Sequence, residues 1–153
     1  MKKYEFNGNF LYSVKLMKKL YSNAIGKVAD EFNISFPEAE VLSFLYEYKQ
    51  FDTAKDIVSY KDVSKAYVSD AVYKLVKKNY LSIKVDKDDR RLQHLEITEL
   101  AKKIAESLQN AQQNFYKAIM SQLTDNEIQK LLTTIEKCAV GIQIEIDRIK
   151  MED

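Results

Sequence analysis

The chain has 153 residues, of which 46% are hydrophobic and 31% are charged, with a formal net charge of +1. This composition can bury a core, so it excludes a disordered chain and predicts one domain, or two small ones that share a core. Three glycines, one proline and one cysteine predict long helices with short connections, exclude an internal disulfide and indicate a reducing cytoplasm.

Neither a membrane segment nor a signal peptide is expected. No apolar run approaches the roughly 18 residues that a membrane helix needs. The two N-terminal lysines are not followed by the apolar stretch of a signal peptide. We therefore expect a cytoplasmic protein with no membrane partner.

The first part of the chain is predicted to form two helices. From about Phe10 to Phe32, apolar residues recur three or four positions apart, which indicates an amphipathic helix. Ser35 and Glu38 then form a capping-box pattern, with Pro37 in the first turn. The helix that follows carries Val41, Leu42, Leu45, Tyr46 and Tyr48 and is expected to be fully packed.

A helix-turn-helix pattern follows. Asp52 and Thr53 can cap a short helix from Ala54 to Tyr60, and residues 61–63 make a tight turn. Ser64 can cap the next helix. Two helices joined by a three-residue turn are the helix-turn-helix arrangement.

The second helix of this pair has a defined start, buried face and end. Val63 and Val68 occupy the positions of a hydrophobic staple. Asn79 lies where a residue in the left-handed conformation would end the helix. Its buried face is expected to consist of Val68, Ala71, Val72, Leu75 and Val76.

A β-hairpin is predicted directly after this helix. Ile83 and Val85 alternate with a lysine, as Leu95 and Ile97 alternate with a glutamate, and both runs are typical of half-buried strands. The turn-like sequence KDDRR lies between them. A hairpin beside a helix-turn-helix is called a wing.

The remainder of the chain is predicted to form two long helices. The first runs from Glu99 to about Met120, and a capping box at Thr124 and Glu127 starts the second. In the second helix an isoleucine recurs every seven residues, at Ile128, Ile135, Ile142 and Ile149. Such a seam can pack within one subunit or against a second copy. We favour a dimer, because the seam continues beyond what a small winged helix needs to cover.

The positive charge is concentrated in one segment. Residues 61–91 hold nine basic and five acidic residues, whereas residues 1–60 hold eight of each. A local surplus of positive charge attracts phosphate, so the pattern favours a nucleic-acid partner. The alternative is a lysine-rich face that is simply solvated.

Helical phasing indicates which side chains would meet double-stranded DNA. With Val68, Val72 and Leu75 directed inward, the opposite face and its flanks are free for the major groove. Asp70 could accept from a cytosine amino group, or it could only orient Lys74. The expected DNA-binding residues of this helix are Ser64, Lys65, Ala66, Tyr67, Ser69, Asp70, Tyr73, Lys74 and Lys77.

The tip of the predicted wing adds further DNA contacts. Lys87, Arg90 and Arg91 supply positive charge, and an arginine is favoured in a narrow minor groove. We expect the neighbouring acids to form ion pairs, with Asp89 holding Arg91 extended. The alternative is an exposed turn whose charges serve solubility.

Residues 35–103 resemble the MarR family of bacterial transcriptional regulators. The sequence VSKAYVSDAVYKLVKKNYLSIKVDKDDRRLQHLEIT looks like the recognition helix, basic wing and closing strand of that family. The D-x-R wing motif corresponds to Asp89 and Arg91. The L-T-x-x-G motif corresponds to Ile97, Thr98 and Ala101.

Two residues depart from the family pattern. Ala101 replaces the usual glycine of the closing motif, and Asn79 replaces the usual glycine before the wing. Both changes concern local backbone geometry rather than the fold.

The resemblance implies a mainly α fold with a small β-wing. It divides the chain into an N-terminal dimerisation helix at 1–34, a winged helix-turn-helix DNA-binding domain at 35–98 and C-terminal dimerisation helices at 99–153. It also implies a homodimer that reads a palindrome. The expected dimer interface comprises Phe10, Val14, Ile128, Ile135, Ile142, Ile146 and Ile149.

The family also implies a pocket for phenolic or other amphipathic ligands. Ten tyrosines and seven phenylalanines could line a site for a small aromatic molecule. The candidate walls are Tyr12, Met17, Tyr21, Tyr46 and Phe115. Ordinary core packing explains the same residues equally well.

The sequence offers no catalytic, metal or cofactor site. It contains no glycine-rich phosphate loop and no apparent Ser–His pairing. With one histidine and one cysteine, a structural zinc site within the chain is excluded. His94 is expected to be partly exposed and structural, and Cys138 to be a packed thiol. We therefore expect no enzyme and no cofactor.

The leading hypothesis is a sequence-specific transcriptional regulator, most often a repressor in such families. It would bind a pseudo-palindromic operator as a homodimer in the bacterial cytoplasm, associated with the nucleoid through DNA, and a small ligand is the candidate signal for its release. One alternative is a weakly specific architectural DNA-binding protein. Another is a helical protein–protein adaptor that has lost DNA binding.

Overall fold

The computed structural model describes residues 9–152, which form six helices and two strands. The first eight residues, where the sequence predicted no signal peptide, and residue 153 lie outside this range. The elements are α1 (Asn9–Glu31), α2 (Phe36–Glu47), α3 (Ala54–Lys61), α4 (Lys65–Lys77), β1 (Leu81–Val85), β2 (Gln93–Ile97), α5 (Glu99–Met120) and α6 (Asp125–Glu152). The prediction of a mainly helical fold with a small wing is confirmed.

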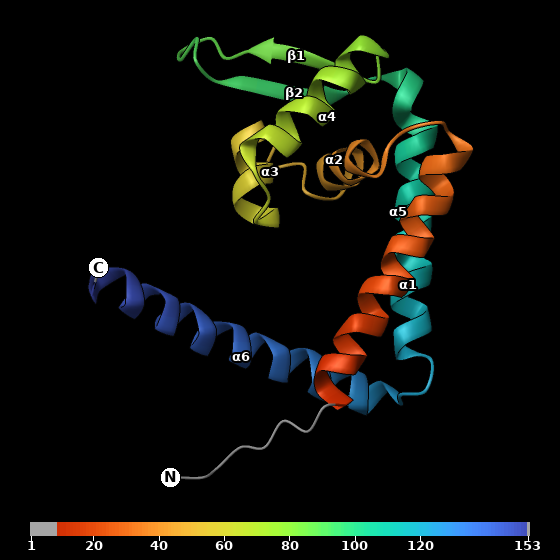
Figure 1. The fold of residues 1–153 in the computed structure, drawn as a ribbon, viewed down its shortest axis with the longest axis vertical. Helices are drawn as coiled ribbons and strands as arrows, with labels where there is room; N and C mark the ends of the chain where they lie inside the picture. Colours follow the sequence, from red (N-terminus) through yellow and green to blue (C-terminus); the bar gives the residue numbers. More distant parts are fainter. Residues whose placement is uncertain (1–8, 153) are drawn as a thin grey trace. The chain divides into compact units, whose positions relative to one another are not determined.

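The chain divides into two compact units, one ending at Tyr116 and one beginning at Lys117. In the first unit, α2 lies at the centre, among α1, α4 and α5 (Figure 1). Burial of large aliphatic side chains holds these helices together, at about 1.5–3 kcal/mol for each one fully buried. The largest of them are Ile25, Leu42, Ile57, Leu75 and Leu108.

Side-chain caps begin three helices of the first unit, as the sequence predicted. Ser35 and Glu38 form the capping box of α2, and Ser64 Oγ accepts the Tyr67 N–H at 3.1 Å at the start of α4. At α3 the cap is Thr53 rather than Asp52. These caps satisfy backbone N–H groups that have no partner inside the helix, and so fix where each helix starts.

Three residues in the left-handed conformation end the helices that precede them. They are Asn33, Asp62 and Asn79, with φ angles of 53°, 50° and 57°. After Asn79 the Tyr80 N–H donates to the Leu75 carbonyl at 2.9 Å, a closure that a left-handed residue permits. The predicted role of Asn79 is confirmed.

The wing is an antiparallel hairpin in which Leu81 pairs with Ile97 and Val85 with Gln93. An isolated bridge between Thr53 and His94 joins the segment before α3 to β2. Leu81 and Leu95 are buried, but Ile83 and Val85 are 41% and 54% exposed. The two predicted strands are confirmed, but the expected burial of their apolar face fails at Ile83 and Val85. The hairpin extends past the helices, so only its base finds a core.

The second unit contains α6, which starts at the predicted capping box. Glu127 accepts the Thr124 N–H at 2.9 Å and the Thr124 hydroxyl at 2.8 Å. Both hydrogen bonds lower the pKa of Glu127. Within the single chain, side chains 129–151 of this helix are exposed. Cys138 is among them, so the expectation of a packed thiol is wrong for the isolated subunit. No helix in the range 9–152 is long and apolar enough to cross a membrane.

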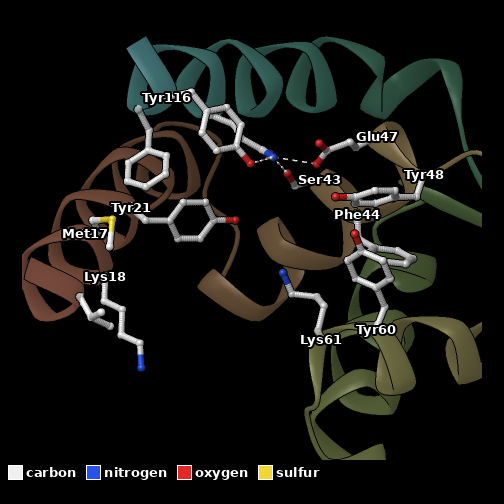
Figure 2. A pocket seen from close by; sticks show the side chains of 13 residues that line it. Met17, Lys18, Tyr21, Ser43, Phe44, Glu47, Tyr48, Tyr60, Lys61 and Tyr116 are labelled. Carbon is white, nitrogen blue, oxygen red and sulfur yellow. Dashed lines mark hydrogen bonds between the residues drawn. The ribbon is translucent and has the colours of Figure 1, made fainter. Parts of the chain in front are cut away.

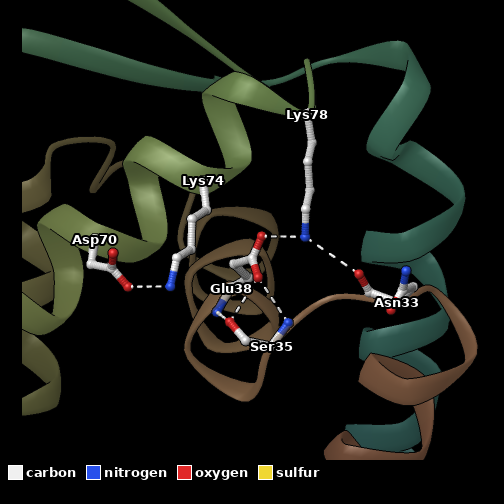
Figure 3. Close-up of polar contacts among 6 residues, drawn as sticks. All are labelled: Asn33, Ser35, Glu38, Asp70, Lys74 and Lys78. Atoms are coloured by element: carbon white, nitrogen blue, oxygen red, sulfur yellow. Dashed lines mark hydrogen bonds and ion pairs between the residues drawn. The ribbon is translucent and has the colours of Figure 1, made fainter.

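An ion pair between a buried carboxylate and an exposed lysine joins the start of α2 to the end of α4 (Figure 3). Glu38, only 2% exposed, accepts from Lys78 Nζ at 2.8 Å, and Lys78 also donates to the Asn33 carbonyl at 3.3 Å. Burial by itself raises the pKa of Glu38, but the hydrogen bonds from Lys78 and Ser35 lower it more, and the net pKa is below its usual value. The carboxylate thus serves both the cap and the ion pair.

We predict that Glu38→Ala lowers the free energy of unfolding by about 2 kcal/mol, because it removes the acceptor of the Ser35 N–H and the hydrogen-bond partner of Lys78. Glu106→Ala, at an exposed position of α5, is the matched control and should change stability by less than about 0.5 kcal/mol. Urea denaturation followed by circular dichroism measures both. Equal stability of the two variants would contradict the assigned role.

Candidate nucleic-acid interface

The outward face of α4 carries most of the residues that the sequence assigned to DNA. Seven of them are exposed: Lys65, Ala66, Ser69, Asp70, Tyr73, Lys74 and Lys77. Ser64 is also exposed, and its hydroxyl is occupied by the helix cap. The opposite face of α4 is buried through Val68, Ala71, Val72 and Leu75, as predicted. The helix therefore presents one polar surface and anchors the other.

Tyr67 departs from the predicted reading face. Its hydroxyl donates to Glu40 on α2 at 2.7 Å, and the same Glu40 carboxylate pairs with Lys61 Nζ at 3.0 Å. Burial and the bond to Glu40 raise the pKa of Tyr67. Tyr67 is thus directed toward α2, and Glu40 is a residue that sequence reasoning missed. No local pattern could reveal a pair 27 positions apart.

The charges on the exposed face of α4 are internally organised. Asp70 accepts from Lys74 Nζ at 2.7 Å, one helical turn away, and this raises the pKa of Lys74 (Figure 3). Lys77 Nζ lies 4.8 Å from the centre of the Tyr73 ring, a cation–π distance. The arrangement agrees with Asp70 orienting Lys74.

The wing tip is closed by backbone contacts rather than by the ion pair that the sequence predicted. Asp86 accepts the N–H groups of Asp88 and Asp89 at 2.8 Å each, and these bonds lower its pKa. Asp89 accepts the backbone N–H of Arg91 at 2.9 Å. Within the described chain, neither Arg90 nor Arg91 forms an ion pair, so the tip leaves both exposed guanidinium groups available.

The base of the wing holds a contact that the sequence did not reveal. His94 Nδ1 lies 2.8 Å from Asp52 Oδ1, and His94 Nε2 lies 3.2 Å from Asp86 Oδ2. Asp52 precedes α3, whereas Asp86 follows β1. The imidazole therefore connects the wing to the body of the first unit. It is half-buried, in agreement with the partly exposed, structural role that was expected.

A cavity of about 410 Å³ lies in the first unit, among α1, α2, the end of α3 and α5 (Figure 2). Met17, Tyr21 and Phe115 line it, as predicted. Tyr12 and Tyr46 do not, and Val14, which was expected at the dimer interface, does. The complete lining comprises Val14, Met17, Lys18, Tyr21, Ser43, Phe44, Glu47, Tyr48, Tyr60, Lys61, Gln112, Phe115 and Tyr116.

Polar groups converge on one wall of this cavity. Gln112 Nε2 donates to Glu47 at 2.7 Å and to the Tyr116 hydroxyl at 3.1 Å, while Gln112 Oε1 accepts from Ser43 at 3.0 Å (Figure 2). On another wall, burial raises the pKa of Tyr21 to about 12, with a smaller contribution from Glu40. Tyr21 is therefore a neutral hydrogen-bonding group at neutral pH.

Residues 32–92 match the sequence model of the MarR family. This segment contains α2, α3, α4 and β1, the parts of the winged helix-turn-helix just described. Over this segment the chain is similar to the MarR family.

Solved structures of similar fold cover almost all of the length of this chain. The MepR–DNA complex of S. aureus aligns with a TM-score of 0.72 at 20% identity, over 92% of this chain and 99% of that chain. A MarR protein from Peptoclostridium difficile DA00132 aligns with a TM-score of 0.75 at 23% identity, over 95% and 94%. A MarR transcriptional regulator from Methanosarcina mazei Go1 gives 0.71 at 19%, over 90% and 99%. No curated protein matches the sequence.

The residues predicted for the dimer interface of this chain lie on α1 and α6. Phe10 is exposed on α1, whereas Val14 is half-buried in the cavity wall. On α6, Ile128 is half-buried. The other predicted interface residues of α6 are exposed in the single chain, namely Ile135, Ile142, Ile146 and Ile149.

Proposed function

We propose that this chain is a sequence-specific DNA-binding repressor of the MarR family, which acts as a homodimer on a pseudo-palindromic operator. The observation that carries the proposal is the division of α4 into a buried apolar face and an exposed polar one, beside a wing with two unpaired arginines. The DNA complex of MepR, a protein of similar fold, supports the choice of partner. The protein would work in the bacterial cytoplasm, at the nucleoid.

The exposed side chains of α4 suit the major groove. Lys65, in the first turn, can reach the acceptors of guanine, and Ala66 or Tyr73 can contact a thymine methyl group. Lys74 and Lys77, in the last turns, are placed for backbone phosphates. Asp70 lowers the local positive charge, but its bond to Lys74 restricts that side chain to a defined position. These features favour base reading over purely electrostatic binding.

The wing supplies the second contact. Arg90 and Arg91 are exposed at its tip, and a guanidinium is attracted by the negative potential of a narrow minor groove. The backbone bonds of Asp86 and Asp89 give the tip a fixed shape without consuming either arginine. A tip of fixed shape loses less conformational freedom when it binds.

A homodimer would provide two such sites. Apolar side chains recur along α6 in the heptad spacing of a helix–helix seam, and they are exposed in the single chain. An apolar surface of this kind indicates a protein–protein interface. Two half-sites about 34–36 Å apart would then be read together, so a small change in their separation would abolish joint binding.

We further propose that the cavity binds a small aromatic ligand that releases DNA. Its aromatic walls can stack on a ring, and Gln112, Ser43 and Tyr21 can hydrogen-bond to hydroxyl groups. Lys61 lines the cavity and also pairs with Glu40, which holds Tyr67 of α4. A ligand anion at Lys61 would compete with Glu40 and so alter the hold on α4.

Selection of bound duplexes from a random pool tests the central proposal. We expect a pseudo-palindromic motif whose half-sites are about one helical turn apart, bound at least about 1,000-fold more tightly than random duplex at matched salt. A ratio near one would instead identify an architectural binder. Absence of binding at about 50 mM salt would identify a protein–protein adaptor.

We predict that Arg91→Ala weakens binding to the selected duplex about tenfold while dimerisation and the melting temperature stay unchanged, because the guanidinium has no partner among residues 9–152. Fluorescence anisotropy measures the affinity. Arg148→Ala, an exposed arginine of α6, is the control and should bind normally. Unchanged affinity of Arg91→Ala would remove the wing from the interface.

We predict that Ile142→Asp converts the dimer to a monomer, because it places a charge in the apolar seam of α6. Sedimentation velocity measures the oligomeric state. Thr133→Asp adds the same charge to the same helix off the heptad positions and should leave the dimer intact. A dimeric Ile142→Asp variant would show that this seam does not form the interface.

We predict that 4-hydroxybenzoate, used as a probe at millimolar concentration, lowers affinity for the selected duplex through the cavity. Met17→Trp fills the cavity mouth without replacing a buried side chain and should abolish this response. Lys19→Trp, exposed on the same helix, should retain it. The same response in both variants would exclude this cavity as the site of action.

A further inference from the structure

The wing is attached to the body of the first unit through a histidine placed between two carboxylates. His94 lies on β2, Asp52 lies in the segment before α3, and Asp86 follows the last residue of β1. The two nitrogen–oxygen distances are 2.8 Å and 3.2 Å. Both ring nitrogens are therefore in contact with an acid, and the acids come from different parts of the fold.

This geometry sets the protonation state of the imidazole. An ionised carboxylate can only accept hydrogen bonds, so each ring nitrogen must donate to keep both contacts. A neutral imidazole has one N–H, whereas the imidazolium has two. Asp52 and Asp86 can thus both be bound only while His94 carries its positive charge.

Lys84 and Asp56, two charged groups on the adjacent elements, have partners of their own. Lys84 is opposite His94 in the strand register, but its Nζ pairs with Glu96 at 2.6 Å. In α3, the Asp56 carboxylate accepts from the N–H and hydroxyl of Thr53. Among these elements, Asp52 and Asp86 are the charged groups in contact with the His94 ring.

Asp86 binds both His94 and the backbone of the wing tip. Its carboxylate holds the N–H groups of Asp88 and Asp89, and its own N–H donates to the Leu92 carbonyl at 3.0 Å. The loop that these bonds close carries Arg90 and Arg91. Loss of the bond between His94 and Asp86 would therefore remove the side-chain contact that ties this loop to the segment before α3 through His94 and Asp52.

We propose that protonated His94 is a positioning residue for DNA binding: by binding Asp52 and Asp86 at once it holds the wing arginines in place, and its deprotonation weakens operator binding. The proposal rests on the DNA-binding function proposed above. His94 itself need not touch DNA.

The direction of the pH effect follows from the partners. Hydrogen bonds to Asp52 and Asp86 raise the pKa of His94 above its usual 6.5. The double contact is therefore complete below the usual pKa and is lost as pH rises through the raised value. Operator affinity should be highest in mildly acidic solution and should fall toward alkaline pH.

The test compares the wild-type chain with His94→Gln, whose affinity for the selected duplex is measured between about pH 6 and about pH 9 at constant ionic strength. We expect the wild type to weaken about tenfold across this range. The affinity of His94→Gln should be independent of pH and close to the low affinity of the wild type at about pH 9, since glutamine does not titrate. Circular dichroism and sedimentation verify that the variant is a folded dimer.

A second variant keeps the proposal testable if His94→Gln does not fold. His94 is the only histidine of the chain, so its imidazole signals can be followed without overlap by nuclear magnetic resonance. Asp86→Asn removes one negative partner and should move both the imidazole titration and the fall in affinity to lower pH. Agreement between the two midpoints supports the proposal.

The possible outcomes distinguish failure of the role proposed for His94 from failure of the proposed DNA-binding function. Equal binding of selected and random duplex by the wild type would overturn the sequence-specific function. Specific binding with the same pH profile in the wild type and His94→Gln would overturn only the role of His94. An imidazole titration that Asp86→Asn leaves unmoved would overturn it as well.

Discussion

The presentation of α4 depends on one buried carboxylate. Glu38 caps α2 through Ser35 and pairs with Lys78 directly after α4, and Lys78 also binds the Asn33 carbonyl after α1. A buried charge is tolerated only where its bonds are satisfied, so the ends of three helices are constrained by the same group. Because Lys78 ties the C-terminal end of α4 to Glu38 and Asn33, the exposed face of α4 keeps a defined orientation.

In the first unit, the residues that hold the fold together are distinct from the residues proposed to contact DNA. Apolar side chains of α4 and the base of the wing lie in the core, while its lysines, Tyr73 and the wing arginines face solvent. Polar contacts connect the supporting residues to the exposed ones. Glu40 binds Tyr67 of α4 and also Lys61, which lines the cavity. His94 binds Asp86, whose carboxylate closes the wing tip. Each link is a place where a local change in charge can alter the proposed DNA-binding surface.

Much of the fold was predictable because its signals are local. Capping boxes, the turn before Ser64, the left-handed Asn79 and the heptad of α6 each involve residues within a few positions of one another. The predictions that failed are those of side-chain burial, because burial depends on which other elements cover a residue. Ile83 and Val85 have strand spacing, yet the hairpin extends beyond the core. Cys138 lies among apolar residues of a helix that is exposed in the single chain.

The sequence by itself determined the winged helix-turn-helix, the segment of positive charge and the outward face of α4, since periodicity and capping are properties of neighbouring residues. Only the tertiary structure decided that Tyr67 turns toward Glu40, that the arginines are unpaired and that His94 joins Asp52 to Asp86. It also decided which aromatic residues enclose the cavity. These contacts join residues far apart in the chain, and distance in space, unlike helical spacing, is set by packing.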